Sequence, residues 1–277
     1  MEGKVVVVTG ASKGIGLATS RAFAARGAHV VMLARSRERL DKEASNIGDR
    51  ALPICADVGD PTQVRNAFEH VAAVHGRIDV LVNNAGVAEL TSIEDATDDQ
   101  IVGSIATNLL GPIYTTRAAI PLLKASGGGS VINISSESTM APFPYLSLYA
   151  SAKGGLETFA RAALAELKPY GIRVTVVVCG ATLTEFASDW DPEVMTRFFA
   201  AAQESGHLAL TSAGQPMQPE AVADALLYIA SRPAGQMIDV LHVRSHDTGD
   251  KQSLVDFAGG ASEPTNGAAS RRSPSPE

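Results

Sequence analysis

Seven short apolar runs, rich in valine, isoleucine and leucine, recur along the chain and constrain the fold more than any other feature of the sequence. Strands that are buried on both faces of a sheet have this near-continuous apolar composition. Between the runs, apolar residues return every three or four positions, as in 15–26 and 62–75, which is typical of helices. Because parallel strands need crossover connections, the alternation predicts a doubly wound α/β fold, with a parallel seven-stranded sheet in a single domain. The runs are Lys4–Thr9, Ala28–Leu33, Ala51–Ala56, Asp79–Asn83, Ser130–Ile134, Arg173–Cys179 and Met237–Val243.

Two segments depart from this alternation. The segment 184–219 is too long for a simple connection and carries several large apolar side chains, so we expect a helical substrate lid there. The segment 249–277 is rich in Gly, Ala, Ser, Pro and charged residues and has no apolar periodicity. It predicts a disordered tail, and the catalytic domain is expected to span 1–248.

Composition excludes several classes of function. The formal net charge is -7, and lysines and arginines are scattered rather than gathered in a basic stripe, which argues against a nucleic-acid partner. No apolar run approaches the ~20 residues that span a bilayer, so we expect a cytoplasmic protein without a membrane partner. The six histidines and two cysteines fall in no metal-ligand or disulfide spacing, and we predict neither a catalytic metal nor a disulfide.

The first predicted strand runs directly into a glycine-rich turn and then into a helix. Glycines permit a tight turn and a close approach of the backbone, so that a pyrophosphate can bind the free amides at the helix N-terminus. The position between the first strand and the first helix makes this motif stronger evidence than an isolated glycine pattern. It predicts a dinucleotide site that contains Gly10, Ser12, Lys13, Gly14, Ile15 and Gly16.

The end of the second predicted strand indicates which dinucleotide binds. An acidic residue there would accept hydrogen bonds from the ribose hydroxyls of NAD, whereas a cation favours the 2′-phosphate of NADP. Arg35 follows this strand, and Lys13 in the glycine turn offers a second positive charge. Arg37 is a third candidate, but by itself it is better explained as a solvated residue of the next helix. We therefore expect NADP(H) rather than NAD(H) as the cofactor.

Polar or small residues also follow the third and fourth predicted strands. Ligands of open α/β sheets bind at the carboxyl ends of the strands, so these residues are expected to contact the cofactor. Small side chains after the fourth strand would let the cofactor lie against the backbone. Asn83 has either this role or a structural one, in which its amide joins neighbouring strands. The residues are Asp57, Val58, Asn83, Asn84, Ala85 and Gly86.

A tyrosine and a lysine four residues apart form the candidate reaction centre. Tyr149 and Lys153 would share one face of a helix, so that the ammonium lies near the phenol. A phenol has an ordinary pKa of about 10, and we expect the nearby cation to lower it toward working pH. Ser136, thirteen residues before Tyr149, can donate a hydrogen bond to a carbonyl oxygen that becomes an alkoxide. Asn108 is unusual inside a helix, and we expect it to hold a water that relays protons to Lys153.

These motifs together resemble the short-chain dehydrogenase/reductase family, and the likeness runs from Gly3 to about Val243. The resemblance implies a catalytic tetrad of Asn108, Ser136, Tyr149 and Lys153, with hydride passing to or from C4 of the nicotinamide. It implies that Lys153 binds the nicotinamide ribose and that Asp57 and Val58 flank the adenine. It also implies a homotetramer or homodimer, formed through helices at about 98–124 and 149–167.

The chain departs from the family pattern at two places. Cys179 and Gly180 stand where the family usually has Pro-Gly after the sixth strand, which removes the rigidity of a proline. Thr184 keeps its place, so the resemblance implies that Gly180, Thr182 and Thr184 contact the nicotinamide end of the cofactor. The glycines that usually follow the last strand are replaced by Val243-Arg244-Ser245-His246, which puts a tetramer contact at that end in question.

Apolar and aromatic residues before Tyr149 and in the segment 184–219 are expected to face the substrate. Such a lining suits a hydrophobic or aromatic ketone, alcohol or diol rather than a phosphorylated sugar. The alternative role for half of the set is to pack the lid against the body. The residues are Ser136, Ser138, Met140, Phe143, Tyr145, Phe186, Trp190, Met195 and Phe198.

Three other functions stay open from the sequence. A non-catalytic NADP-binding sensor or scaffold would use the same fold, but it would not need the Tyr149 and Lys153 pair. An NAD-dependent alcohol or diol dehydrogenase would share every motif except the cations after the second strand. A sugar-nucleotide epimerase usually carries a longer carboxyl-terminal substrate domain, whereas this sequence ends in a low-complexity tail.

Overall fold

A computed structural model describes residues 1–206 and 216–245, in which all seven predicted strands form one parallel sheet. The strand order is β3-β2-β1-β4-β5-β6-β7, so the chain winds outward in both directions from β1 and β4, as a doubly wound sheet requires. The strands are β1 Val5–Thr9, β2 His29–Ala34, β3 Ala51–Cys55, β4 Val80–Asn83, β5 Gly129–Ser136, β6 Ile172–Cys179 and β7 Val240–Val243.

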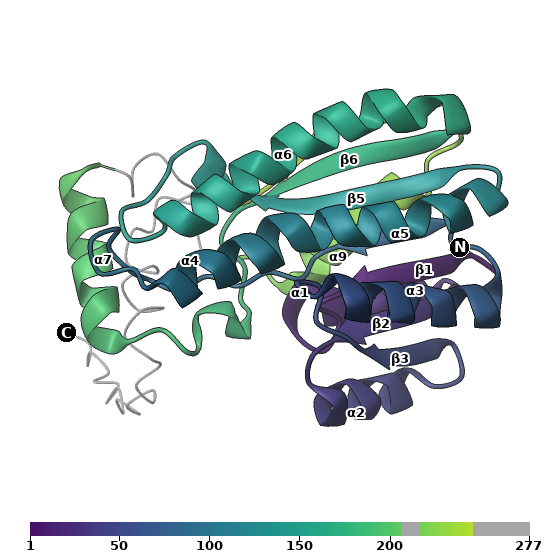
Figure 1. The fold of residues 1–277 in the computed structure, drawn as a ribbon, viewed down its shortest axis with the longest axis horizontal. Helices are drawn as coiled ribbons and strands as arrows, with labels where there is room; N and C mark the ends of the chain where they lie inside the picture. Colours follow the sequence, from purple (N-terminus) through teal and green to yellow (C-terminus); the bar gives the residue numbers. More distant parts are fainter. Residues whose placement is uncertain (207–215, 246–277) are drawn as a thin grey trace, which may run out of the picture.

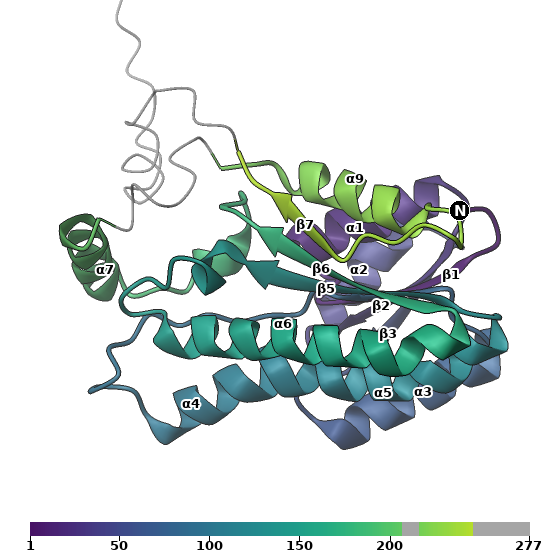
Figure 2. The ribbon, with the colours of Figure 1, turned by 90° about the horizontal axis from the view of Figure 1, so that it is seen from above.

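Helices cover both faces of the sheet (Figure 1), and the view from above separates the resulting three layers (Figure 2). Residues of α3, α5 and α6 pack on one face, and residues of α1, α2 and α9 pack on the other. The helices are α1 Gly14–Ala25, α2 Arg37–Ile47, α3 Pro61–His75, α4 Asp98–Ile105, α5 Gly111–Ala125, α6 Ser147–Leu167, α7 Pro192–Glu204 and α9 Pro219–Ala230.

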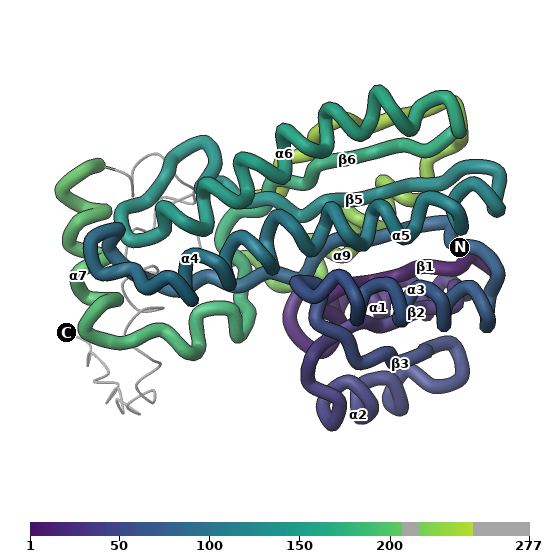
Figure 3. The backbone as a smooth tube through the Cα atoms, viewed as in Figure 1, coloured from purple at the N-terminus to yellow at the C-terminus, as the bar shows by residue number. Residues whose placement is uncertain are grey.

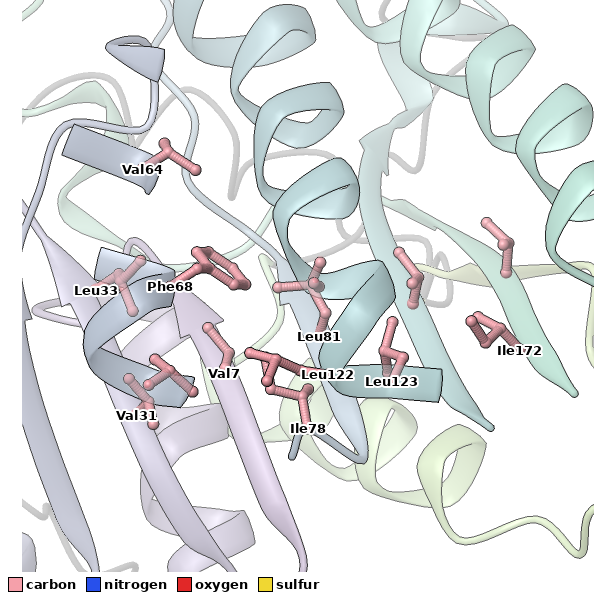
Figure 4. Packing of buried hydrophobic residues seen from close by; sticks show 14 of the residues in the cluster. Val7, Val31, Leu33, Val64, Phe68, Ile78, Leu81, Leu122, Leu123 and Ile172 are labelled. Atoms are coloured by element: carbon pink, nitrogen blue, oxygen red, sulfur yellow. The ribbon is translucent and has the colours of Figure 1, made fainter. Parts of the chain in front are cut away.

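Successive residues of each central strand are buried in opposite halves of the core. Val7 and Leu33 contact the cluster beneath α3, α5 and α6, whereas Val8 and Met32 contact the cluster beneath α1, α2 and α9. Figure 4 shows the first cluster, in which Phe68 of α3 lies over the strands. Because a strand alternates its side chains between faces, burial on both sides explains why these strands read as unbroken apolar runs.

The segment 184–219 contains a short 3-10 turn at Glu185–Ala187 and helix α7, while 207–215 lies outside the described residues. In the backbone trace α7 stands at one end of the molecule (Figure 3). A bridge between Thr182 and Met217 joins the two ends of the segment. The predicted tail at 249–277 and His246 also lie outside the described residues.

Candidate active site

The glycine turn has the backbone geometry that the sequence predicts. Gly10 and Gly14 have φ angles of 66° and 54°, in the left-handed region that favours glycine. Gly16 lies so close to the preceding turn that an added Cβ would be 2.3 Å from the carbonyl oxygen of Gly10. Lys13 precedes α1 and its side chain makes no capping hydrogen bond, so the first amides of α1 stay available to an anion.

The residues after β4 hold this turn in place. Asn84 donates a side-chain hydrogen bond to the Thr9 carbonyl at 2.9 Å, and the Thr9 hydroxyl accepts the backbone N–H of Asn84 and of Ala85 at 3.0 Å. Asn83 points away from this contact. Its amide donates to Asn133 of β5 at 2.9 Å, so Asn83 joins neighbouring strands.

A cleft of about 760 Å³ opens along the carboxyl edge of the sheet, within the size range of ligand sites. It brings together most of the predicted site residues from both halves of the sheet. Those that line it are Gly10, Ser12, Lys13, Gly14, Ile15, Arg35, Asp57, Val58, Asn84, Ala85, Gly86, Ser136, Ser138, Tyr149, Lys153, Gly180, Thr182, Thr184, Phe186 and Trp190. Gly16, Asn108, Met140 and Tyr145 are not among the lining residues.

Charged residues gather at the end of the cleft beside β2. Arg35 lies 3.9 Å from the carboxylate of Asp57, and Lys13 donates to the Glu185 backbone carbonyl at 3.3 Å. Arg39 of α2 makes a two-pronged ion pair with the carboxylate of Glu185. This hydrogen-bonded pair holds the pKa of Glu185 below its ordinary value. Arg37 is exposed and is not a lining residue, which agrees with its reading as a solvated residue.

Arg39 and Glu185 are site residues that were not predicted from the sequence, in which Arg37 was the last candidate cation. Arg39 is the third residue of α2, one turn beyond Arg35, and this spacing was the available signal. The sequence offered no signal for Glu185, because its partner on α2 is 146 positions away.

Tyr149 and Lys153 share one face of α6 and point into the same cleft, as predicted. The ammonium nitrogen of Lys153 lies 5.6 Å from the centre of the Tyr149 ring and donates to the Ile134 carbonyl at 2.8 Å. A hydrogen bond with Ser136 also engages the Tyr149 side chain. The phenol, the hydroxyl and the ammonium therefore come together where β5 ends.

The expected fall in the pKa of Tyr149 is wrong for this geometry. Burial raises the pKa of Tyr149 above 10, and the hydrogen bond with Ser136 offsets only part of that rise. Burial also lowers the pKa of Lys153 to about 8, so the ammonium itself is destabilised. Loss of hydration is therefore the largest effect on the pKa of both groups in this site.

Asn108 occupies a π-helical turn at Ala106–Leu110, between α4 and α5. Its side chain donates to the Val87 carbonyl at 2.8 Å and accepts the Val87 N–H at 3.1 Å, so it anchors the loop after β4. Asn108 lies behind Gly86, since a Cβ added at Gly86 would be 3.0 Å from the Asn108 oxygen and 3.6 Å from Lys153 Nζ. π-Helical turns within longer helices are frequent at functional sites. This turn accounts for the asparagine at a position that the sequence predicts to be helical.

Glu157 is a further site residue that the sequence analysis missed. Its carboxylate accepts hydrogen bonds from the Ser135 hydroxyl at 2.6 Å and from the Thr139 hydroxyl at 2.8 Å. These two residues flank Ser136 on either side along the chain. Because Glu157 is one helical turn beyond Lys153, its position on the face shared with Tyr149 was the signal that could have found it.

Aromatic residues line the other end of the cleft. Phe143, Phe198 and Phe199 line it together with Trp190, whose indole N–H donates to the Ala88 carbonyl at 2.8 Å. With that N–H satisfied, these side chains offer an apolar wall. Ser138 is buried in the same lining, and its hydroxyl has no hydrogen-bond partner among the described residues.

Three expected substrate contacts are placed elsewhere. Met140 is 55% exposed and lies outside the cleft, because the 3-10 turn at Glu137–Thr139 carries it to the surface. Tyr145, with a φ of 63°, lines a separate depression beside Ile93. Met195 packs in the cluster under α7 without lining the cleft.

The segment after β6 closes the cleft opposite the glycine turn. Cys179 is buried at the end of β6, and burial raises the pKa of its thiol to about 12. Gly180 N–H donates to the Val243 carbonyl at 2.9 Å, which ties the segment to β7. Thr184 packs against the glycine turn, since a Cβ added at Gly14 would be 3.0 Å from its methyl group.

The cleft fits a dinucleotide along its whole length. Glycines without room for a Cβ and uncapped amides of α1 form a cradle for a pyrophosphate, and cations lie where an adenosine ribose would meet the end of β2. No cluster of three His, Cys, Asp or Glu side chains suited to a metal ion occurs within residues 1–206 and 216–245. In the same part of the chain, no helix has the length and apolar character needed to cross a bilayer.

Comparison with known proteins agrees with this geometry. Residues 4–194 match the family model described as short chain dehydrogenase. An uncharacterised oxidoreductase of Methylorubrum extorquens is 38% identical over 239 residues, which cover 84% of this chain and 93% of that protein.

Two solved structures share the fold. A metagenomic short-chain oxidoreductase in complex with NADP has a TM-score of 0.72 and 30% identity, covering 88% of this chain and 97% of its own. The 3-ketoacyl-(acyl-carrier-protein) reductase of Brucella melitensis, complexed with NADH, has a TM-score of 0.77 and 27% identity, covering 90% and 98%. The chain therefore belongs to the short-chain dehydrogenase family, as an oxidoreductase of CH–OH groups that uses NAD(P)(H).

Proposed function

We propose that this protein is an NADP(H)-dependent oxidoreductase that interconverts a carbonyl and a secondary alcohol, with Tyr149 as the general acid and base. When bound, the cofactor supplies or accepts a hydride at C4 of its nicotinamide. The observation that carries the proposal is that Tyr149, Ser136 and Lys153 line the same cleft as the glycine turn. A binding protein without catalytic activity would have no need to bury these groups together.

The three side chains divide the proton chemistry between them. The Tyr149 phenol is protonated at neutral pH, because burial raises its pKa further above the ordinary value of about 10, so Tyr149 can donate its proton to a carbonyl oxygen as that oxygen gains charge. Ser136 can donate a second hydrogen bond to the same oxygen. Lys153 has a pKa of about 8, and this value suits a group that gives and regains a proton near neutral pH.

Positive charge at the end of β2 supports NADP(H) over NAD(H). Lys13, Arg35 and Arg39 all line that end of the cleft, where the 2′-phosphate would lie. The solved relatives include complexes with NADP and with NADH, so the family alone does not select between them. The charge of this chain is therefore the basis for the choice.

The aromatic end of the cleft supports a hydrophobic or aromatic substrate. Phe143, Trp190, Phe198 and Phe199 contribute apolar surface there, and 184–206 would act as the lid over it.

A homodimer or homotetramer that pairs α4, α5 and α6 with a second copy is the expected assembly, as the family resemblance implies.

Replacement of Tyr149 by Phe tests the catalytic role. We expect turnover of NADPH with apolar ketones to fall about 10²- to 10⁴-fold, because the proton donor is lost, while the Kd for NADPH changes less than about twofold. Tyr145→Phe is the matched control, since Tyr145 lies outside the cleft. Turnover that survives in Tyr149→Phe would overturn the proposal, and preference for charged ketoacids would overturn the substrate class.

A further inference from the structure

Two arginines at the 2′-phosphate end of the cleft are already engaged by carboxylates. Arg39 pairs with Glu185 through both guanidinium nitrogens, and Arg35 lies 3.9 Å from Asp57. All four residues line the cleft. The positive charge that would attract a phosphate is therefore partly neutralised by the protein itself.

Glu185 differs from Asp57 in what it can do when a cofactor binds. Asp57 follows β3, and one of its carboxylate oxygens accepts a hydrogen bond from the backbone N–H of Gly59 at 2.8 Å. Glu185 begins the short turn after Thr184, and its side chain is 50% exposed, with Arg39 as the ion-pair partner found in the described residues. Its carboxylate is therefore free to turn into solvent if Arg39 finds another anion.

The backbone of Glu185 is held independently of its carboxylate. Its carbonyl oxygen accepts hydrogen bonds from Lys13 at 3.3 Å and from the Ser188 hydroxyl at 2.9 Å. Thr184, the preceding residue, packs on Gly14. Loss of the Arg39 contact would therefore leave the start of the lid in place, and the ion pair is not needed to position it.

We propose that Glu185 sets the preference between NADP(H) and NAD(H) by competing with the 2′-phosphate for Arg39, an inference that rests on the NADP(H) site proposed above. The 2′-phosphate must displace the Glu185 carboxylate to pair with Arg39, and it is also repelled by that carboxylate. NAD(H) has no phosphate at this position, so it leaves the Arg39 and Glu185 pair intact. Glu185 thus lowers the affinity for NADP(H) and not the affinity for NAD(H).

The test measures the Kd of NADPH and of NADH by titration of cofactor fluorescence, without any substrate. We expect Glu185→Gln to bind NADPH about fivefold more tightly, the scale of an exposed ion pair, and to bind NADH within about twofold of the unchanged protein. Arg39→Gln should weaken NADPH and leave NADH unchanged. In the double variant the gain from Glu185→Gln should shrink, because Arg39, for which the carboxylate and the phosphate compete, is gone.

Glu2→Gln is the matched control, since Glu2 also makes an exposed ion pair, with Arg50 at 3.1 Å, but does not line the cleft. It should change neither Kd. Equal weakening of both cofactors by Glu185→Gln would mean that the pair fastens the lid, and an unchanged NADPH Kd would mean that no competition exists; either result overturns the inference. Tight binding of NADH with no binding of NADPH by the unchanged protein would instead overturn the NADP(H) site itself, and the inference with it.

Discussion

Replacement of Lys153 by methionine should stabilise the protein while, on the proposed mechanism, it destroys activity. Lys153 is 2% exposed, and its burial lowers the pKa from 10.5 to about 8. The folded protein therefore holds a charge at neutral pH in surroundings that disfavour it. Methionine has a similar length and no charge, so it can fill the same space without that cost.

The size of the effect follows from the pKa. At 1.36 kcal/mol per pKa unit, a pKa lowered from 10.5 to about 8 corresponds to about 3 kcal/mol of destabilisation below pH 8. Loss of the hydrogen bond to the Ile134 carbonyl offsets about 1 kcal/mol. The net gain of about 2 kcal/mol corresponds to a rise in Tm of roughly 4–8 °C for a domain of this size.

The gain should depend on pH with a definite sign. Between about pH 8 and 10.5 the unfolded lysine binds its proton more than the folded lysine does, so the stability of the unchanged protein rises with pH in this window. Lys153→Met has no such group and does not gain. At pH 9.5 the advantage of the variant should therefore fall by about 2 kcal/mol relative to pH 7.

Thermal unfolding at pH 7 and at pH 9.5 checks both statements, with Lys42→Met as control. Lys42 is exposed on α2, and its replacement should change the free energy of unfolding by less than about 0.5 kcal/mol at either pH. A Tm of Lys153→Met at or below that of the unchanged protein at pH 7 would refute the reasoning. So would a difference that stays constant with pH, because the cost would then not come from the ammonium.

Two further predictions concern the frame around the reacting groups. Gly16→Ala should abolish NADPH binding and lower the free energy of unfolding by about 1–3 kcal/mol, because its Cβ would meet the Gly10 carbonyl at 2.3 Å. Gly154→Ala on α6, where nothing lies within 4 Å of the added Cβ, is the control and should be neutral or stabilising. Equal shifts of Tm in the two variants would contradict this prediction. Glu157→Gln should lower kcat severalfold and leave the Kd for NADPH unchanged, because the carboxylate holds Ser135 and Thr139, which lie on either side of Ser136 along the chain. A parallel loss of cofactor affinity would indicate a merely structural role.

Local pattern was sufficient for the elements and for the glycine turn. The central strands were predictable because each buries both faces, and the run Lys4–Thr9 contains the observed Val5–Thr9. The glycine turn was predictable because its backbone geometry excludes most side chains. The last strand is shorter than its run, Val240–Val243 instead of Met237–Val243, since an edge strand pairs on one side only.

Helix periodicity could place Tyr149 and Lys153 on one face of α6, but it could not predict the direction in which their pKa values shift. Proximity of a cation suggested a lowered pKa for the phenol. The structure buries Lys153 and partly buries Tyr149, and loss of hydration acts on each of them in the direction that disfavours charge. Sequence spacing does not report burial, so the sign of the pKa change could not be obtained from it.

The chain's own sequence determined the order of strands and helices, the glycine cradle and the helical face that carries Tyr149 and Lys153, because these depend on residues that are neighbours along the backbone. Only the tertiary structure decided that Arg39 meets Glu185, and that Glu157 holds the residues on both sides of Ser136. Such contacts depend on how separate helices and loops dock on the sheet. Periodicity identifies the face that a helix buries, but not the side chain that it will meet there.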